Sequence, residues 1–441
     1  MKTLPECTPP EAFTEKIANS ITRRATGTID AIVGDRIDVV GLNAAVGSHC
    51  RIETATGTRG IAKVIGFHDV NPVLSAFDQI RGISVGDRVE LLSEQPSVGV
   101  GPGLLGRVID ALGRPIDGKP LPPALESCPV ESDPPNSLDR PPIDTIFETG
   151  IRAFDGLLTC GVGQRIGIFA GAGVGKSTLQ GMLARSTKAD AIVIGLVGER
   201  GREVREFIEH TLGEAGMSRS VIVVSTNDQP AAMRIQAAWT ASAIASSLRR
   251  SGKNVVLLID SITRFATAQR EIGLAAGEPP TTRGYPPSVF AQLPKLVEQS
   301  GRTSEGSVTA FYTVLVDGDD TNEPVSDTLR GLLDGHVILS RKLAGEGHWP
   351  AIDVLESLSR LQNKLVTPSQ IQACTRVRQW LATFRSNEDL INIGAYKKGT
   401  SAELDKAIDI QPVIKAFLAQ LWNQQAPIAD TIRQLEQLAA A

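Results

Sequence analysis

The clearest pattern in this chain is an alternation of apolar runs with helical stretches between residues 143 and 362. Each run has the length of a strand and few polar residues, which is typical of strands buried on both faces of a sheet. The runs lie at residues 166–169, 191–197, 221–224, 255–259, 308–316 and 336–339. Because helical patterns lie between most of them, we predict an α/β fold with a mainly parallel sheet.

Residues 24–95 show a different pattern, in which short β-branched runs alternate with turn signals such as Gly34-Asp35. Strands this short and this closely spaced are typical of a small antiparallel barrel. The runs cover residues 28–33, 36–40, 51–56, 61–67 and 88–92. We therefore predict a β-barrel domain over residues 24–95.

The segment that follows, residues 96–142, is rich in proline and glycine, with the pairs Pro122-Pro123, Pro134-Pro135 and Pro141-Pro142. This composition favours an extended connection that wraps the next domain rather than a packed unit. We predict that it forms the lead-in of a domain covering residues 96–362.

The last part of the chain, residues 363–441, has helical periodicity. A helix start is predicted at Thr367-Pro368-Ser369-Gln370, and a later helix after Pro427. The apolar stripe of the first helix consists of Ile371, Cys374, Val377, Leu381 and Phe384. Its spacing makes Cys374 a core residue rather than a nucleophile.

An amphipathic helix is predicted near the start of the chain, over residues 8–22 of an N-terminal segment 1–23. Thr8 can cap it, and an apolar face recurs at Phe13, Ile17 and Ile21. This stripe would pack either on its own domain or on a partner helix, and the pattern leaves both open.

Charge and cysteine content exclude several classes of protein. The net charge is −4 over 441 residues with both signs interspersed, so the chain has neither a basic nucleic-acid footprint nor a polybasic membrane segment. Five cysteines without pairing or ligand spacing argue for a reducing compartment and against a disulfide framework or zinc site. With no signal-peptide pattern and no long apolar span, we expect a cytoplasmic protein.

Candidate chemistry begins where the run 166–169 ends, in a glycine-rich turn followed by an amphipathic stretch. Strand, turn and helix in this order form a phosphate-binding loop, in which backbone N–H groups surround the phosphates. Lys176 would reach the β- and γ-phosphates, and the Ser177 hydroxyl would ligate Mg²⁺. The loop consists of Gly171, Ala172, Gly173, Val174, Gly175, Lys176, Ser177 and Thr178. Ala170 stands where the pattern usually has glycine, which is tolerable if its φ is negative.

Two carboxylates follow predicted strands of the same sheet. Asp260 follows the run 255–259, at the carboxyl edge where open α/β sheets bind ligands, and it would hold Mg²⁺ directly or through water. Glu199 follows the run 191–197 and would orient and polarise the attacking water. The alternative for Glu199 is a helix-start carboxylate or an ion pair with Arg200.

These motifs together resemble the rotary-type hexameric ATPases, which include the catalytic subunit of ATP synthase. They resemble more closely the ATPases of type III protein export, in flagella and virulence injectisomes. The export family is matched by residues 268–280, 283–290, 332–341, 394–399 and 403–407. The resemblance implies a barrel, a RecA-like ATPase core and a C-terminal helical domain, assembled as a homo-hexameric ring.

The resemblance also implies roles for single residues. Arg200 and Arg264 match family arginines near the γ-phosphate, and Arg360 matches the arginine finger that one subunit inserts into its neighbour's site. Trp349 stands where the family places an aromatic residue, usually tyrosine, against adenine. The alternatives are a surface arginine for Arg360 and a core aromatic for Trp349.

The family further implies ATP as substrate and Mg²⁺ as cofactor. It implies stalk or regulator proteins, export substrates and chaperones as partners, and a peripheral position at the inner-membrane export apparatus. The tail 387–396 favours a flagellar system, with an injectisome ATPase or an ATP synthase catalytic subunit as alternatives. Nucleic-acid translocation is disfavoured, because residues 24–94 contain only Phe67 and Phe77 as aromatics. The presence of Glu199 disfavours a non-catalytic ring subunit.

Overall fold

The computed structural model describes residues 24–316 and 323–440, which belong to two compact units, Met1–Gln95 and Pro96–Ala441. The helix predicted over residues 8–22 lies outside the described residues and stays a prediction.

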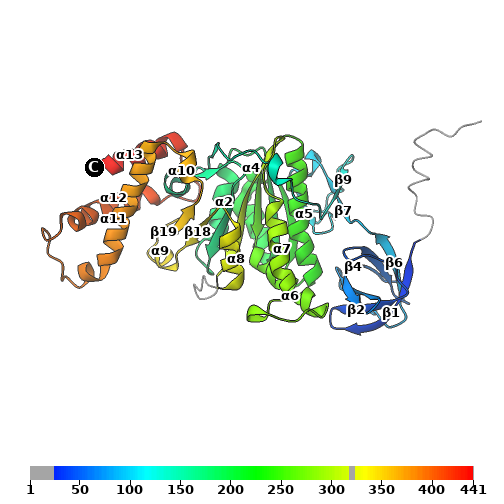
Figure 1. The fold of residues 1–441 in the computed structure, drawn as a ribbon. Coiled ribbons are helices and arrows are strands. Elements are labelled where there is room, and N and C mark those ends of the chain that lie inside the picture. The colour runs from blue at the N-terminus through cyan, green and yellow to red at the C-terminus, as the bar shows by residue number, and fades with distance from the viewer. Residues whose placement is uncertain (1–23, 317–322, 441) are drawn as a thin grey trace, which may run out of the picture. The chain divides into compact units, whose positions relative to one another are not determined.

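The first unit forms a small barrel of strands (Figure 1). The barrel is closed, and its strand order is β1-β2-β5-β4-β3-β6. Its strands are β1 (Thr26–Val33), β2 (Arg36–Val40), β3 (His49–Glu53), β4 (Arg59–His68), β5 (Asn71–Ala76) and β6 (Arg88–Ser93). Alternate side chains such as Ile29, Ile52 and Val64 fill the interior and are almost fully buried. The structure confirms the predicted barrel.

The sequence pattern missed one barrel strand, β5. Its second residue, Pro72, has no N–H to donate to a sheet, and the strand follows a tight turn at Asp69, whose φ is 55°. Proline and turn residues normally argue against a strand. The structure nevertheless pairs β5 with both β4 and β2, because closing the barrel requires a strand between them.

The second unit is built on a nine-stranded sheet with the order β19-β18-β12-β17-β15-β13-β14-β8, and β16 pairs with β17. Its strands are β8 (Arg107–Asp110), β12 (Arg165–Ala170), β13 (Ala191–Glu199), β14 (Ser220–Thr226), β15 (Asn254–Asp260), β16 (Gly301–Arg302), β17 (Ser307–Leu315), β18 (Gly335–Leu339) and β19 (Ile352–Ser359). All neighbours along the main order are parallel except β18 and β19. This confirms the predicted α/β class.

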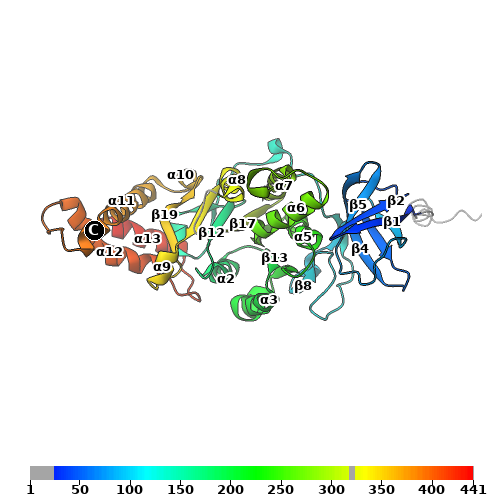
Figure 2. The same ribbon diagram turned by 90° about the horizontal axis from the view of Figure 1, so that it is seen from below.

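Helices cover both faces of this sheet, with α2 and α3 on one side and α6, α7 and α8 on the other (Figure 2). The helices of this part are α2 (Lys176–Ser186), α3 (Gly201–Glu206), α4 (Gly213–Met217), α5 (Ala231–Arg250), α6 (Ile262–Ala275), α7 (Pro287–Glu298), α8 (Pro324–Leu332), α9 (Arg341–Gly345) and α10 (Gln362–Leu365). The alanine-rich α5 packs on β13 and β15. Because helices cover both faces, the sheet is accessible mainly at the two ends of its strands.

The lead-in, residues 96–142, is more ordered than predicted. Its strand β8 adds to the sheet by parallel pairing with β14, and β7 (Ser97–Val100) pairs with β9 (Glu126–Pro129) in a separate two-stranded sheet. A second small sheet joins β10 (Ile146–Phe147) to β11 (Cys160–Gly161). The expectation of a purely extended connection was therefore wrong, because β8 completes the edge of the sheet.

The C-terminal region is helical, with α11 (Pro368–Asn392), α12 (Ala402–Leu418) and α13 (Ile428–Ala440). The Thr367 side chain caps α11 by accepting from the N–H of Gln370, and Cys374 is buried, as predicted. Val377, Ile414 and Leu435 belong to the same apolar cluster as sheet residues, so these helices share the core of the second unit. The predicted boundary at residue 362 stays a prediction. Among the described residues, none of the helices combines the length and apolar composition that crossing a bilayer requires.

Candidate active site

The phosphate loop predicted at Gly171–Thr178 lies between the end of β12 and the start of α2, as the motif requires. Gly175 is the N-cap of α2 with a φ of 85°, a conformation that glycine adopts without strain. Because glycine has no side chain to cap the helix, the first N–H groups of α2 remain available to an anion. Ser177 and Thr178 are exposed here, and Ala170 has no positive φ, so its methyl group fits.

Three strand ends bring one lysine and two carboxylates together beside this loop. Lys176 Nζ lies 3.0 Å from Glu199 Oε1, at the end of β13, and 2.6 Å from Asp260 Oδ1, at the end of β15. The three side chains are only 4–14% exposed. We call Lys176, Glu199 and Asp260 the phosphate-loop cluster. Its side chains carry one positive and two negative charges when all three are ionised.

Burial and this surplus of negative charge set the protonation of the cluster. Burial and the neighbouring Asp260 raise the pKa of Glu199 to about 7, against the opposing effect of Lys176. Burial alone would lower the pKa of Lys176, but attraction to Asp260 and Glu199 outweighs it and raises that pKa. A raised carboxylate pKa beside a lysine and a helix N-terminus is typical of catalytic sites.

The chemistry of the donors fits a magnesium nucleotide. Asp260, Glu199 and Ser177 supply hard oxygen atoms, and Mg²⁺ is usually held by one or two carboxylates together with substrate phosphates. Within residues 24–316 and 323–440, no group of three or more His, Cys, Asp or Glu could hold a metal ion. Two carboxylates and a hydroxyl form a donor set that suits a cation whose remaining ligands are the phosphates of a nucleotide.

The two arginines predicted near the γ-phosphate lie differently. The stem of Arg264, on α6, lies so close to Gly198 that a Cβ there would be 3.0 Å from Arg264 Cβ. Its Nε is buried without a hydrogen-bond partner among the described residues, so it has donor capacity left for an anion beside Glu199. Arg200 is 70% exposed and pairs with Glu203 at 2.9 Å, so the structure does not bring it into the cluster.

Arg360 lies near the amino ends of the parallel strands, whereas its own phosphate loop lies at their carboxyl ends. Strand β19 runs antiparallel to β18, and Ser359 pairs with Gly335 at the start of that strand. Because β18 runs parallel to β12, Arg360 is level with the beginning of β12, whereas the loop follows its end. The six residues of β12 span about 20 Å. Arg360 is exposed and donates to the carbonyl of Arg330, and it cannot reach Lys176 of its own chain.

Trp349 lies against the phosphate loop. A Cβ on Gly175 would be 2.7 Å from Trp349 Cζ3, so the ring contacts the last glycine of the loop. The side chain is partly open to solvent, with the residue 40% exposed, and its backbone carbonyl accepts from the N–H of Gln420. An aromatic ring beside a phosphate loop can serve a nucleotide base, and this arrangement does not fit the alternative of a core aromatic.

Two features of this region were not found from the sequence. The first is Thr313 on β17, whose Oγ1 lies 2.6 Å from Asp260 Oδ1. A threonine inside a strand run gives no signal of its own, because β-branched residues are common in strands.

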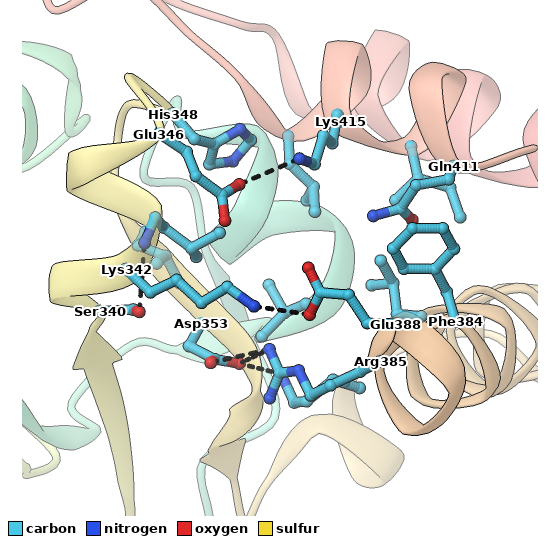
Figure 3. A pocket seen from close by; sticks show the side chains of 17 residues that line it. Ser340, Lys342, Glu346, His348, Asp353, Phe384, Arg385, Glu388, Gln411 and Lys415 are labelled. Atoms are coloured by element: carbon cyan, nitrogen blue, oxygen red, sulfur yellow. Dashed lines mark hydrogen bonds and ion pairs between the residues drawn. The ribbon is translucent and has the colours of Figure 1, made fainter. Parts of the chain in front are cut away.

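The second is a cavity of about 300 Å³ between the segment 340–355 and the helices α11 and α12 (Figure 3). Three ion pairs join its two sides: Lys342–Glu388 at 2.5 Å, Asp353–Arg385 at 2.8 Å and Glu346–Lys415 at 3.0 Å. We call the cavity that these six residues border the ion-paired cavity. Its pairs join residues far apart in sequence, so local patterns could not reveal it.

The fold and the phosphate loop define a P-loop ATPase, and comparisons with known proteins agree with this fold and class. Residues 150–359 match the ATP synthase alpha/beta family, nucleotide-binding domain, and residues 366–437 match the T3SS EscN ATPase C-terminal domain. A flagellum-specific ATP synthase of Bacillus subtilis (strain 168) is 52% identical over 415 residues, which cover 93% of this chain and 94% of that protein.

Two solved structures are also similar. The assembled ATPase EscN from the enteropathogenic E. coli type III secretion system has a TM-score of 0.89 and 43% identity, over 94% of this chain and 100% of that chain. EscN in complex with its central stalk EscO has a TM-score of 0.86 and 42% identity over the same shares of the two chains. The chain belongs to the family of flagellum-specific ATP synthases and type III secretion system ATPases.

Proposed function

We propose that this chain hydrolyses Mg-ATP to energise protein export through a flagellar type III apparatus, as one subunit of a homo-hexameric ring. The observation that carries the chemistry is the phosphate-loop cluster, in which Lys176, Glu199 and Asp260 converge at the carboxyl edge of the sheet. We prefer a flagellar system to an injectisome because of the tail 387–396, since the identities to flagellar relatives (43–52%) and to type III secretion relatives (45–48%) overlap.

The residues of the loop bind and orient the substrate. Backbone N–H groups of Gly171–Thr178 hold the phosphates, and Lys176 exchanges its carboxylate partners for the β- and γ-phosphates. Asp260 and Ser177 would hold Mg²⁺, which would neutralise charge at the phosphates. Trp349 stacks on adenine at the rim of the site.

Glu199 and the arginines act on the transferring phosphoryl group. Glu199 accepts a hydrogen bond from the attacking water and orients it toward the γ-phosphate, which requires the carboxylate to be ionised. Arg264 donates to the phosphate from beside Gly198, and Arg360 is supplied by the neighbouring subunit because its own loop is out of reach. Arg200 remains a candidate for the same charge, which would require it to leave Glu203.

Partners follow from the same family. The EscN structure with its central stalk supports a stalk or regulator protein as partner of this chain, besides export substrates and their chaperones. We place the ring in the cytoplasm, peripherally at the inner-membrane export apparatus.

The test replaces the water-orienting carboxylate. Glu199→Gln should lower ATP turnover by about 10²–10⁴-fold while nucleotide affinity stays close to that of the wild type. Glu209→Gln removes a carboxylate that pairs with Arg205 at the surface, so it is the matched control and should keep its turnover. Near-normal turnover of Glu199→Gln would contradict the proposed role.

A further inference from the structure

Thr313 is a buried hydroxyl between the strands that carry the phosphate loop and Asp260. It lies on β17, where it pairs in register with Ile168 of β12, and the preceding Tyr312 pairs with Ile259 of β15. The residue has no exposed surface. Its backbone is therefore fixed from both sides by the sheet, directly beneath the phosphate-loop cluster.

The hydroxyl of Thr313 has one proton and two acceptors within reach. Its Oγ1 lies 2.6 Å from Asp260 Oδ1 and 3.2 Å from the carbonyl oxygen of Ile259. The shorter contact is to a carboxylate, and hydrogen bonds to charged acceptors are the shorter and stronger ones. Thr313 therefore donates to Asp260, whose Oδ1 also accepts from Lys176 at 2.6 Å.

These two donors to Asp260 Oδ1 differ in what they do when a nucleotide binds. Lys176 has to leave the carboxylates to reach the phosphates, and it would then leave Oδ1 buried with one partner fewer. An unsatisfied buried acceptor costs more than a hydrogen bond gains, especially on a charged group. Thr313 has no competing role, and the sheet holds it in place.

We propose that Thr313 is a positioning residue for the metal carboxylate. Its hydroxyl keeps Asp260 Oδ1 hydrogen-bonded while Lys176 moves to the phosphates, and it fixes the orientation of the carboxylate that would hold the metal of the incoming Mg-nucleotide. This inference rests on the proposed role of Asp260. Thr313 itself contacts neither nucleotide nor metal, so it acts only through Asp260.

The test is a titration of ADP onto the full chain, with Mg²⁺ and with EDTA, followed by calorimetry. Thr313→Val removes the donor and keeps the shape of the side chain, and it should weaken Mg-ADP binding about tenfold. Binding of metal-free ADP should be unchanged. Thr313→Ser restores the hydroxyl and should recover the wild-type affinity for Mg-ADP.

A matched control loses a buried threonine hydroxyl from the same strand, away from the site. Thr309 Oγ1 accepts from the N–H of Gly163, and Thr309→Val should leave the effect of Mg²⁺ on ADP affinity intact. Thermal melts verify that each variant folds. Equal losses with and without Mg²⁺, or failure of Thr313→Ser to recover binding, would overturn the role of the hydroxyl.

Asp260→Asn separates this inference from the function on which it rests. Loss of the Mg²⁺ effect in Asp260→Asn, together with wild-type behaviour of Thr313→Val, overturns the inference about Thr313 alone. If Asp260→Asn keeps the full Mg²⁺ effect, the proposed role of Asp260 fails, and the role of Thr313 fails with it.

Discussion

The phosphate-loop cluster and the ion-paired cavity are both made of basic side chains and carboxylates, but their charges balance differently. In the cluster, one ammonium group serves two carboxylates, and the side chains are 4–14% exposed. In the cavity, each of three cations has its own carboxylate, and the three cationic side chains are 43–64% exposed. One region is buried with a surplus of negative charge, and the other has balanced charges and is partly open to solvent.

This difference indicates different tasks. A balanced pair at the surface has nothing to gain from a new partner, and such pairs contribute little free energy. A buried surplus of negative charge gains when a cation enters, and burial together with the neighbouring Asp260 raises the pKa of Glu199. We therefore read the cavity as a structural contact between the segment 340–355 and the helices, and the cluster as a site of exchange.

The sharpest test of this comparison removes one lysine from each region. Lys176→Ala should abolish ATP turnover, because the charge that stabilises the phosphates is lost. Lys342→Ala removes the ammonium group of the Glu388 pair and should keep most of the turnover. A phosphate-release assay on both variants, with thermal melts, makes the measurement. Comparable losses in both would break the comparison.

The next largest effect is expected from Arg360, the positive charge that a neighbouring subunit would add to the phosphate-loop cluster. Arg360→Ala should lower turnover by about 10³-fold or more, because a finger supplied by a neighbour stabilises the transition state. Mixing inactive Arg360→Ala with inactive Lys176→Ala chains should restore part of the activity. Arg433→Ala, whose side chain is exposed and pairs with Asp430, serves as control. No rescue in any mixture would place the finger elsewhere.

A smaller effect should appear in stability against pH. The folded pKa of Glu199 is raised from 4.5 to about 7, so between these values the folded chain holds a proton that the unfolded chain releases. Stability from this group is therefore lost as pH rises from 4.5 through 7, by at most about 3 kcal/mol.

Glu199→Gln does not titrate, so it should melt above the wild type at pH 8, and the difference should shrink at pH 5. Melting curves of Glu209→Gln, which loses a surface carboxylate paired with Arg205, provide the baseline at the same two pH values. A difference that is independent of pH would mean that the titration of Glu199 is not the cause.

The smallest effect is expected in the cavity. Lys415→Ala removes one of its ion pairs, and the unfolding free energy should change by no more than about 1 kcal/mol, less at high salt. Denaturant titrations at low and high salt measure this. A larger, salt-independent loss would show that the cavity does more than hold two elements together.

The sheet of the second unit could be predicted because its central strands are apolar runs, which can be recognised from the local sequence alone. The strands that were missed depend on partners far along the chain. Only the pairing of β8 with β14 makes Arg107–Asp110 a strand, and only barrel closure does so for β5, which contains Pro72. Local patterns do not register such long-range pairing.

The candidate site divides in the same way. The proximity of Lys176, Glu199 and Asp260 could be expected, because the carboxyl ends of parallel strands meet at one edge. The contact of Thr313 with Asp260 depends on the register between β17 and β15, which no motif encodes. The distance of Arg360 from its own loop likewise depends on the antiparallel return of β19, which was not predicted.

That return strand has a consequence for assembly. With Arg360 acting only on a neighbour, an open row of subunits always has one loop without a finger at one end and one finger without a loop at the other. When the row closes into a ring, the free finger meets the free loop, and every site is then complete. A single chain in dilute solution would then hydrolyse ATP slowly, and hydrolysis would be confined to the places where rings have assembled.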